Sequence, residues 1–120
     1  MFFMENDCFK EKEMIYTLGE SLLDIIVENP DKVISRAGGA MLNAAVSLAR
    51  AKAEVSLISE LGDDQTSTFI IDFLKANKVN TNYIKKYYHN NTSLALAFLD
   101  AEKKPTYTFY KSYPNPRNLI

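Results

Sequence analysis

Two short segments of the sequence combine residues suited to binding a polyhydroxyl compound. Asp24 interrupts the apolar run 22–27, and a carboxylate in such a run must face water, a partner or a ligand. Gly38 and Gly39 precede a helical pattern, so the backbone there can approach a ligand closely and the helix start can bind oxygen atoms. Asn43 follows one turn later, and its amide can both donate to and accept from a hydroxyl. Asp24, Gly39 and Asn43 together predict a site that recognises vicinal hydroxyls.

Each of these features also has a purely structural interpretation. Asp24 would lie on the solvent face of an edge strand. Gly38, Gly39 and Asn43 would form a tight strand-to-helix turn followed by a surface residue. The residue types and their spacing leave both interpretations open.

Other classes of site find little support in the sequence. It contains neither the G-x-x-x-x-G-K-[ST] phosphate loop nor the G-x-G-x-x-G dinucleotide fingerprint. The one histidine, His89, lies in an expected loop and is interpreted as a solvated side chain. Cys8 has acidic neighbours, which would not activate a thiol, and no Cys/His set has zinc spacing. We therefore expect no metal site, and we expect neither His89 nor Cys8 to be catalytic.

Length and charge restrict the function further. The chain has 120 residues, with 14 Lys and Arg against 15 Asp and Glu, so its formal net charge is −1. This balance argues against a nucleic-acid partner, because binding through phosphate contacts needs a basic excess. We find no convincing secretory leader and no apolar run of about 18 residues. We therefore expect no membrane partner and a cytoplasmic location.

Hydrophobic periodicity predicts strands that alternate with helices, and hence a parallel sheet. The expected strands are residues 14–18, 22–27, 33–36, 54–59, 83–88, 94–99 and 106–111. The expected helices are 40–51, with Leu42, Ala45, Val46 and Ala49 along one face, and 65–76, with an apolar stripe of Phe69, Ile70, Phe73 and Leu74. Either Asp63 or Asp64 can cap the second helix. The regions 22–36 and 94–111 do not fit the alternation, and we expect them to form a separate, small antiparallel layer.

Aromatic side chains gather in the hairpin expected at 94–111. They are Phe98, Tyr107, Phe109 and Tyr110. Aromatic residues on a sheet are usually core or interface residues. The alternative is a lid, with one face over a ligand and the other against a partner subunit.

Several short motifs have a recognisable order along the chain. They are Gly19-Glu20-x-Leu22-x-Asp24, Ala37-Gly38-Gly39-Ala40-x-x-Asn43-x-Ala45-x-x-Leu48-Ala49-Arg50 and Gly62-Asp63-Asp64. Together they resemble the N-terminal part of the ribokinase-type (PfkB) carbohydrate kinases. The stretches Thr92-Ser93-Leu94-Ala95-Leu96-Ala97-Phe98 and Thr108-Phe109-Tyr110-Lys111-x-Tyr113-Pro114 are most similar to the fructokinase-like branch. The similarity extends over about residues 14–117.

The resemblance implies an α/β fold, namely the N-terminal part of a ribokinase-like three-layer α/β/α arrangement with a small β-sheet lid. Residues 1–120 would form a single partial domain, with lid strands at about 22–36 and 94–111. The complete enzyme would transfer the γ-phosphoryl group of ATP, with Mg²⁺, to a sugar hydroxyl. The residues implied to bind the sugar are Asp24, Gly38, Gly39, Asn43, Ala95, Phe109 and Lys111. The lid strands would also build a homodimer.

The chain departs from the family pattern in two ways. Lys52 and Lys78 stand after the two helices, where the family usually has Gly because the backbone is left-handed, at a cost on the order of 1 kcal/mol. The family's catalytic Asp, in a Gly-Ala-Gly-Asp segment, and its ATP-binding region are not in this sequence. We therefore expect residues 1–120 to bind neither ATP nor Mg²⁺ and to have no kinase activity alone. The alternatives are a non-enzymatic sugar-binding or dimerising fragment, and an inert truncation product whose unpaired strand edge favours self-association.

Overall fold

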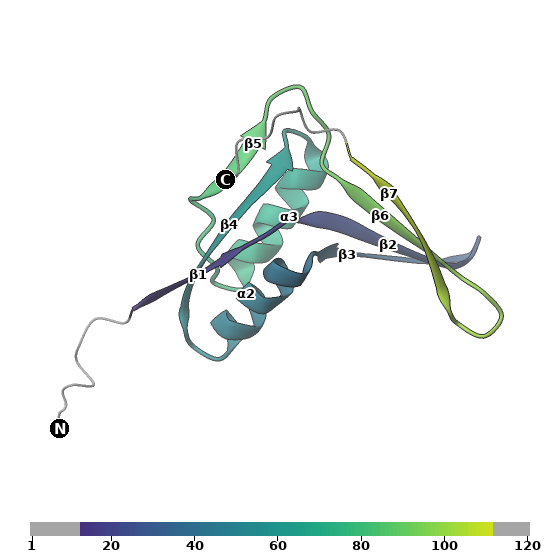
Figure 1. Ribbon diagram of the computed structural model, residues 1–120, viewed down its shortest axis with the longest axis horizontal. Helices are drawn as coiled ribbons and strands as arrows, with labels where there is room; N and C mark the ends of the chain where they lie inside the picture. The colour runs from purple at the N-terminus through teal and green to yellow at the C-terminus, as the bar shows by residue number, and fades with distance from the viewer. Residues whose placement is uncertain (1–12, 112–120) are drawn as a thin grey trace.

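The computed structural model describes residues 13–111, and in that part of the chain the strands are grouped in two sheets (Figure 1). The strands are β1 (Met14–Leu18), β2 (Leu22–Asn29), β3 (Lys32–Gly38), β4 (Glu54–Gly62), β5 (Ile84–Tyr87), β6 (Leu94–Leu99) and β7 (Pro105–Tyr110), and the helices are α2 (Ala40–Arg50) and α3 (Gln65–Ala76). Among the described residues, no helix is long and apolar enough to cross a membrane. Cys8 and the end of the fructokinase-like stretch at Tyr113 and Pro114 lie outside the described residues.

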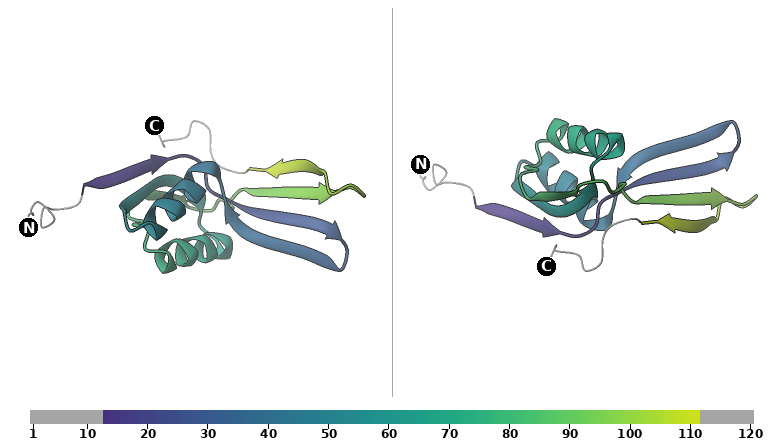
Figure 2. Two further views of the ribbon diagram at one scale, coloured as in Figure 1. Left: turned by 90° about the horizontal axis from the view of Figure 1, so that it is seen from below. Right: turned by 90° about the horizontal axis from the view of Figure 1, so that it is seen from above.

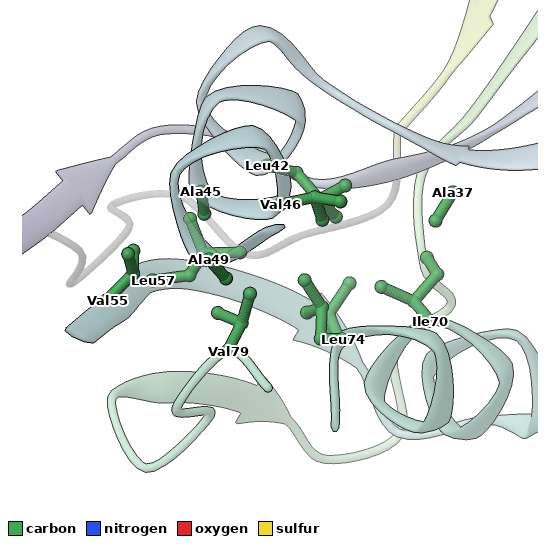
Figure 3. Packing of buried hydrophobic residues seen from close by; sticks show 11 residues of the cluster. Ala37, Leu42, Ala45, Val46, Ala49, Val55, Leu57, Ile70, Leu74 and Val79 are labelled. Carbon is green, nitrogen blue, oxygen red and sulfur yellow. The ribbon is translucent and has the colours of Figure 1, made fainter. Parts of the chain in front are cut away.

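The first sheet is parallel, in the order β1-β4-β5, as the alternation of strands and helices predicted. Both helices lie on one side of this sheet (Figure 2). The apolar stripe expected on α2 is buried against β4, and Leu42 and Leu57 are fully inaccessible to solvent. Figure 3 shows these side chains meeting Leu74 of α3 in one cluster. This core joins the sheet β1-β4-β5 to α2 and α3, and we call this unit the α/β part.

The apolar stripe predicted on α3 is only partly buried. Ile70 and Leu74 are fully buried in the core, and Phe73 packs against it from a partly buried position. Phe69 is 49% exposed and lies with Leu23 of β2 beside a shallow cavity. Phe69 therefore belongs to the junction with the second sheet rather than to the core.

The second sheet, here called the lid, has the order β3-β2-β6-β7. β6 pairs antiparallel with β7, so the hairpin expected at 94–111 is present, and β2 pairs antiparallel with β3 in the region 22–36. The expectation of a purely antiparallel layer is wrong, because β2 and β6 are parallel. Both strands leave the first sheet in the same direction, β2 after β1 and β6 after β5, so they run side by side (Figure 1).

Several element boundaries also differ from the expected ones. β4 continues to Gly62, and β5 has only four residues. β3 continues to Gly38, so Gly39 alone is the N-cap of α2. Propensity cannot define these ends, because strand length depends on how far the neighbouring strand continues.

The ends of the two helices follow local rules closely. Asp64, and not Asp63, caps α3: its side chain accepts from the Ser67 N–H, and the Ser67 hydroxyl completes a capping box. Lys52 and Lys78 have φ values of 76° and 65°, which confirms the left-handed backbone expected after each helix.

Candidate functional site

Asp24 lies at the centre of the lid rather than at its margin. β2 is flanked by β3 and β6, so the alternative interpretation of Asp24 as an edge-strand residue is wrong. Its side chain is half-buried and lies directly against Gly38, where any Cβ atom would overlap the carboxylate. Partial burial raises the pKa of the Asp24 carboxyl, and the positive charge of Arg36 opposes part of that shift.

Gly39 forms the passage from the lid into α2. Its φ of 115° strongly disfavours a side chain, and a Cβ atom there would overlap the backbone carbonyl of Glu20. Within residues 13–111 no side chain caps this helix start, and its first turn carries no acidic residue. The Asn43 N–H donates to the Gly39 carbonyl at 2.9 Å, so Asn43 lies one turn inside the helix.

Asn43 is exposed and lines an open cavity of about 600 Å³. Arg36 of β3 and Arg50 of α2 line the same cavity. Arg36 is also the Cα partner of Asp24 across the lid, so it adjoins both parts of the expected site. Arg36 is not among the residues expected from the sequence, and no local signal could have found it, because its place depends on the register of β2 with β3.

The three remaining residues of the expected site lie on β6, on β7 and just after β7. Ala95 is the Cα partner of Asp24, and Phe109 is the Cα partner of Ala95, so these side chains share one face of the lid. Ala95 is 2% exposed, whereas Phe109 is 57% exposed and its ring stacks with Tyr107 at a centroid distance of 6.0 Å. The ammonium group of Lys111 is held by the Glu20 carboxylate, with both N–O distances at 3.1 Å.

The expected residues therefore fall into three places. Asp24, Gly38, Ala95 and Phe109 gather on one face of the lid, Gly39 and Asn43 lie at the start of α2 near Arg36 of β3, and Lys111 is bound at the base of the lid. A second cavity, of about 470 Å³, connects Phe109 and Lys111 with Thr92. A carboxylate, an amide, a close glycine backbone and an aromatic ring can together hold a compound with several hydroxyl groups and one apolar face.

Other polar groups do not add to this site. His89 is exposed in a loop, as expected, with its ring 4.0 Å from that of Tyr88. Arg50 donates to the Asn77 side chain at 2.9 Å near the C-terminal ends of the helices, where cations complement the helix dipole. Among residues 13–111, no group of three or more His, Cys, Asp or Glu side chains could hold a metal ion.

A parallel α/β unit that carries a mixed four-stranded lid, with a carboxylate set against the glycines at the lid's base, defines the class of ribokinase-like carbohydrate kinases. Comparison with known proteins agrees with this class. The sequence profile described as "pfkB family carbohydrate kinase" matches residues 9–118, so the chain belongs to the pfkB family.

Fructokinases are prominent among the proteins similar to this chain. A fructokinase from Klebsiella pneumoniae is 30% identical over 95 residues, which are 79% of this chain and 31% of that protein. The crystal structure of a fructokinase from Xylella fastidiosa with bound ATP matches 84% of this chain and 34% of that protein, with a TM-score of 0.75 and 29% identity. A fructokinase from Halothermothrix orenii gives a TM-score of 0.74 at 27% identity, and the match covers 83% of this chain and 38% of that one. The chain thus spans about a third of the length of these relatives.

Proposed function

We propose that this chain is the sugar-binding, N-terminal portion of an ATP-dependent carbohydrate kinase of the fructokinase-like branch. The observation that carries the proposal is the Asp24 carboxylate, half-buried on a central lid strand and packed on the glycine backbone that enters α2. A partly buried carboxylate is costly unless donors approach it, and sugar hydroxyls are suitable donors. Family membership and the similarity to fructokinases support the choice of a sugar.

Each candidate residue would make a different contact with the sugar. Asp24 would accept hydrogen bonds from sugar hydroxyls, and Asn43 would donate and accept from the other side. The glycine backbone at residues 38 and 39 would allow the sugar to lie close to the main chain. Ala95, a small residue paired with Asp24, would let the sugar lie against the sheet, the Phe109 ring would cover the apolar face of the sugar, and Lys111 would close the base of the lid.

The remaining chemistry would come from polypeptide outside this chain. ATP, with Mg²⁺, would supply the phosphoryl group, and positioning with charge stabilisation would provide most of the rate enhancement. Residues 1–120 would have no kinase activity alone, because in the family the catalytic Asp lies downstream of the matched region. The complete enzyme would act in the cytoplasm, where ATP is available.

The test is calorimetric titration of the chain with fructose. Removing a hydrogen bond to a charged group costs about 1.5–3 kcal/mol, so Asp24→Asn should weaken binding by roughly tenfold or more. Asp31→Asn is the matched control, because it makes the same change in the exposed turn of the same hairpin. Absence of heat with the unchanged chain, or equal affinity of Asp24→Asn, would overturn sugar binding. Sugar-dependent ATP turnover by the purified chain would overturn the claim that it is inactive alone.

A second candidate function, self-association through the lid, is favoured by β7. Among the described residues this strand pairs only with β6, and all six of its residues are exposed, among them Tyr107, Phe109 and Tyr110. An exposed aromatic edge strand can pair with a second copy of itself. Sedimentation should show a homodimer that Tyr107→Lys dissociates, whereas Tyr88→Lys, in a loop on the α/β part, should leave it intact. A monomer at all concentrations would contradict this second function.

A further inference from the structure

The two halves of the proposed sugar site lie on different parts of the molecule. Asp24 and Ala95 belong to the lid, whereas Asn43 belongs to α2 of the α/β part. Any sugar that contacts both halves therefore requires a defined position of the lid relative to the α/β part. The lid projects away from the helices, and its contact with them is confined to its base (Figures 1 and 2).

Buried polar side chains lie at this base beside buried apolar ones such as Leu22 and Ala37. Ser59 is fully buried, Ser21 is 1% exposed and Thr92 is 4% exposed. Burying a hydroxyl group costs free energy unless the hydroxyl is hydrogen-bonded. Each of these side chains therefore needs a specific hydrogen-bond partner. We call the group Gly19, Ser21, Ser59, Gly62, Asp64 and Thr92 the lid joint.

The Asp64 carboxylate links three segments in the lid joint. One oxygen accepts from the Thr92 hydroxyl at 2.7 Å and from the Ser67 N–H at 2.9 Å, and the other accepts from the Thr92 N–H at 2.8 Å. The Thr92 hydroxyl in turn accepts from the Gly62 N–H at 3.0 Å. The end of β4, the start of α3 and the chain entering β6 are thus held by one carboxylate and one hydroxyl.

A second link joins the chain entering β2 to β4. The hydroxyls of Ser21 and Ser59 are 2.7 Å apart, and the Ser59 hydroxyl donates to the Gly19 carbonyl at 2.6 Å. Both central lid strands therefore begin at a hydrogen bond to the α/β part. The backbone also passes closely at Gly62, where a Cβ atom would overlap the main chain at residues 90–92.

The position of Thr92 is passed on to Asp24 by strand pairing. Thr92 lies just before β6, and Leu94 and Ala95 pair with Leu23 and Asp24. The Leu23 N–H also donates to the Ser93 carbonyl at 3.0 Å. A shift of Thr92 relative to α3 would consequently carry Asp24 with it.

We propose that Asp64 and Thr92 are positioning residues for the sugar site: their hydrogen bonds set the place of the lid, and of Asp24, relative to Asn43. The role in sugar binding rests on the proposed function, but the effect on the lid itself does not. The two can therefore be tested separately.

The lid is tested by measuring distances between two spin labels. Labels are placed at Lys75→Cys, on α3, and at Lys104→Cys, in the turn between β6 and β7, after Cys8→Ser removes the native thiol. Both label sites are exposed. The chain should give one narrow distance distribution, and Thr92→Val, which keeps the side-chain shape but loses the hydroxyl, should broaden it. Thr92→Ser should restore the narrow distribution.

Ser67→Ala is the matched control, because it removes the Ser67 hydroxyl contact to the Asp64 backbone and leaves the Thr92 bonds in place. It should keep the distribution narrow even if the start of α3 loosens. If Thr92→Val does not fold, Asp64→Asn serves instead, since it replaces an acceptor of Thr92 by an amide that keeps the cap's shape. An unchanged distribution in the folded variant, or equal broadening by Ser67→Ala, would overturn the proposal.

Fructose titration forms the second arm. If Thr92→Val leaves about a tenth of the molecules with the lid in place, the apparent affinity for fructose should fall about tenfold, and Thr92→Ser should recover it. No binding by the unchanged chain would refute the proposed function, while the distance measurement would still decide the positioning role. Broadening with no change in affinity would refute the role of the joint in the sugar site.

Discussion

The α/β part and the lid are stabilised in different ways. Leu42, Leu57, Leu61, Ile70 and Leu74 of the α/β part are all fully buried. In the lid, the most buried side chains of β6 are Ala95 and Ala97, and β7 has no buried residue. The lid therefore depends on backbone pairing and on its joint, whereas the α/β part depends on apolar burial.

This difference separates the tasks of the two parts. A close-packed core holds α2 and Asn43 in place with little freedom. A thin sheet can present Asp24 and Phe109 to a ligand without a core of its own, provided that something fixes its base. The cost of this arrangement is an open lid surface, which accounts for the exposed aromatic residues on β7.

The largest effect should come from opening a cavity in the core. Leu57→Ala should lower the free energy of unfolding by about 3 kcal/mol, because a fully buried Leu loses both transfer energy and packing. Phe98→Ala, at a lid position that is 47% exposed, should cost about 1 kcal/mol or less. Urea titration followed by far-ultraviolet circular dichroism measures both. Equal losses would contradict the contrast between the two parts.

The next effect concerns the carboxylate that joins the two parts. Burial opposes ionisation of Asp64, but hydrogen bonds from Thr92 and Ser67 outweigh it and lower its pKa. The unfolded chain therefore binds this proton first, and the stability that Asp64 contributes is lost as pH falls from its ordinary pKa through the lowered one. Asp64→Asn should cost about 1 kcal/mol at pH 7 and remove that part of the acid dependence.

Asp24 provides a control of opposite sign for the pH measurement. Because burial raises the pKa of Asp24, its contribution is greatest at low pH and declines as pH rises through the raised pKa. Asp24→Asn should therefore not reduce stability at pH 7. Melting curves of both variants between pH 3 and pH 7 distinguish the two carboxylates, and parallel curves would contradict this assignment.

A smaller effect on the free energy of unfolding is expected at Lys52, the left-handed residue that follows α2. Lys52→Gly should raise the free energy of unfolding by about 0.5–1 kcal/mol, because glycine adopts the left-handed backbone at φ 76° without strain. Lys75→Gly is the matched control within the last turn of α3, where glycine should instead cost about 1 kcal/mol. Stabilisation by both changes, or by neither, would contradict the backbone explanation.

The smallest effect lies at the tip of the lid. Hydrogen bonds from Lys103 and Lys32 lower the pKa of the Glu28 carboxyl, with Nζ–O distances of 2.7 Å and 3.2 Å. Titration followed by NMR should show the lowered pKa of Glu28. Lys103→Gln should bring this pKa most of the way back to the usual value of a glutamate. Lys104→Gln, whose partner is Glu102, should leave it unchanged. High salt should weaken the shift, because exposed charges are screened.

Much of the local structure could be predicted from the sequence. The periodicity of Leu42 and Ala45 located α2 and its buried face. The Gly-Asp-Asp motif placed a cap at the start of α3, and the family pattern of a glycine after each helix indicated left-handed residues at Lys52 and Lys78. These features depend on neighbours within a few residues, which is the range over which capping and periodicity act.

The predictions that were wrong concern partners distant in the sequence. The parallel pairing of β2 with β6 and the exposure of Phe69 depend on how the two sheets meet. The place of Arg36 beside Asp24 depends on strand register, and a shift of one residue would turn it to the other face.

The sequence by itself therefore determined the order of the elements, the helix caps and the residues available for a hydroxyl-binding site. The tertiary structure decided which of those residues share a face, and it added the bond between Asp64 and Thr92, residues 28 positions apart. Local sequence patterns predict the backbone conformation of a few residues and which face of a helix or strand is apolar. Contacts between distant segments follow from the packing of whole sheets, and in this protein that packing places the lid.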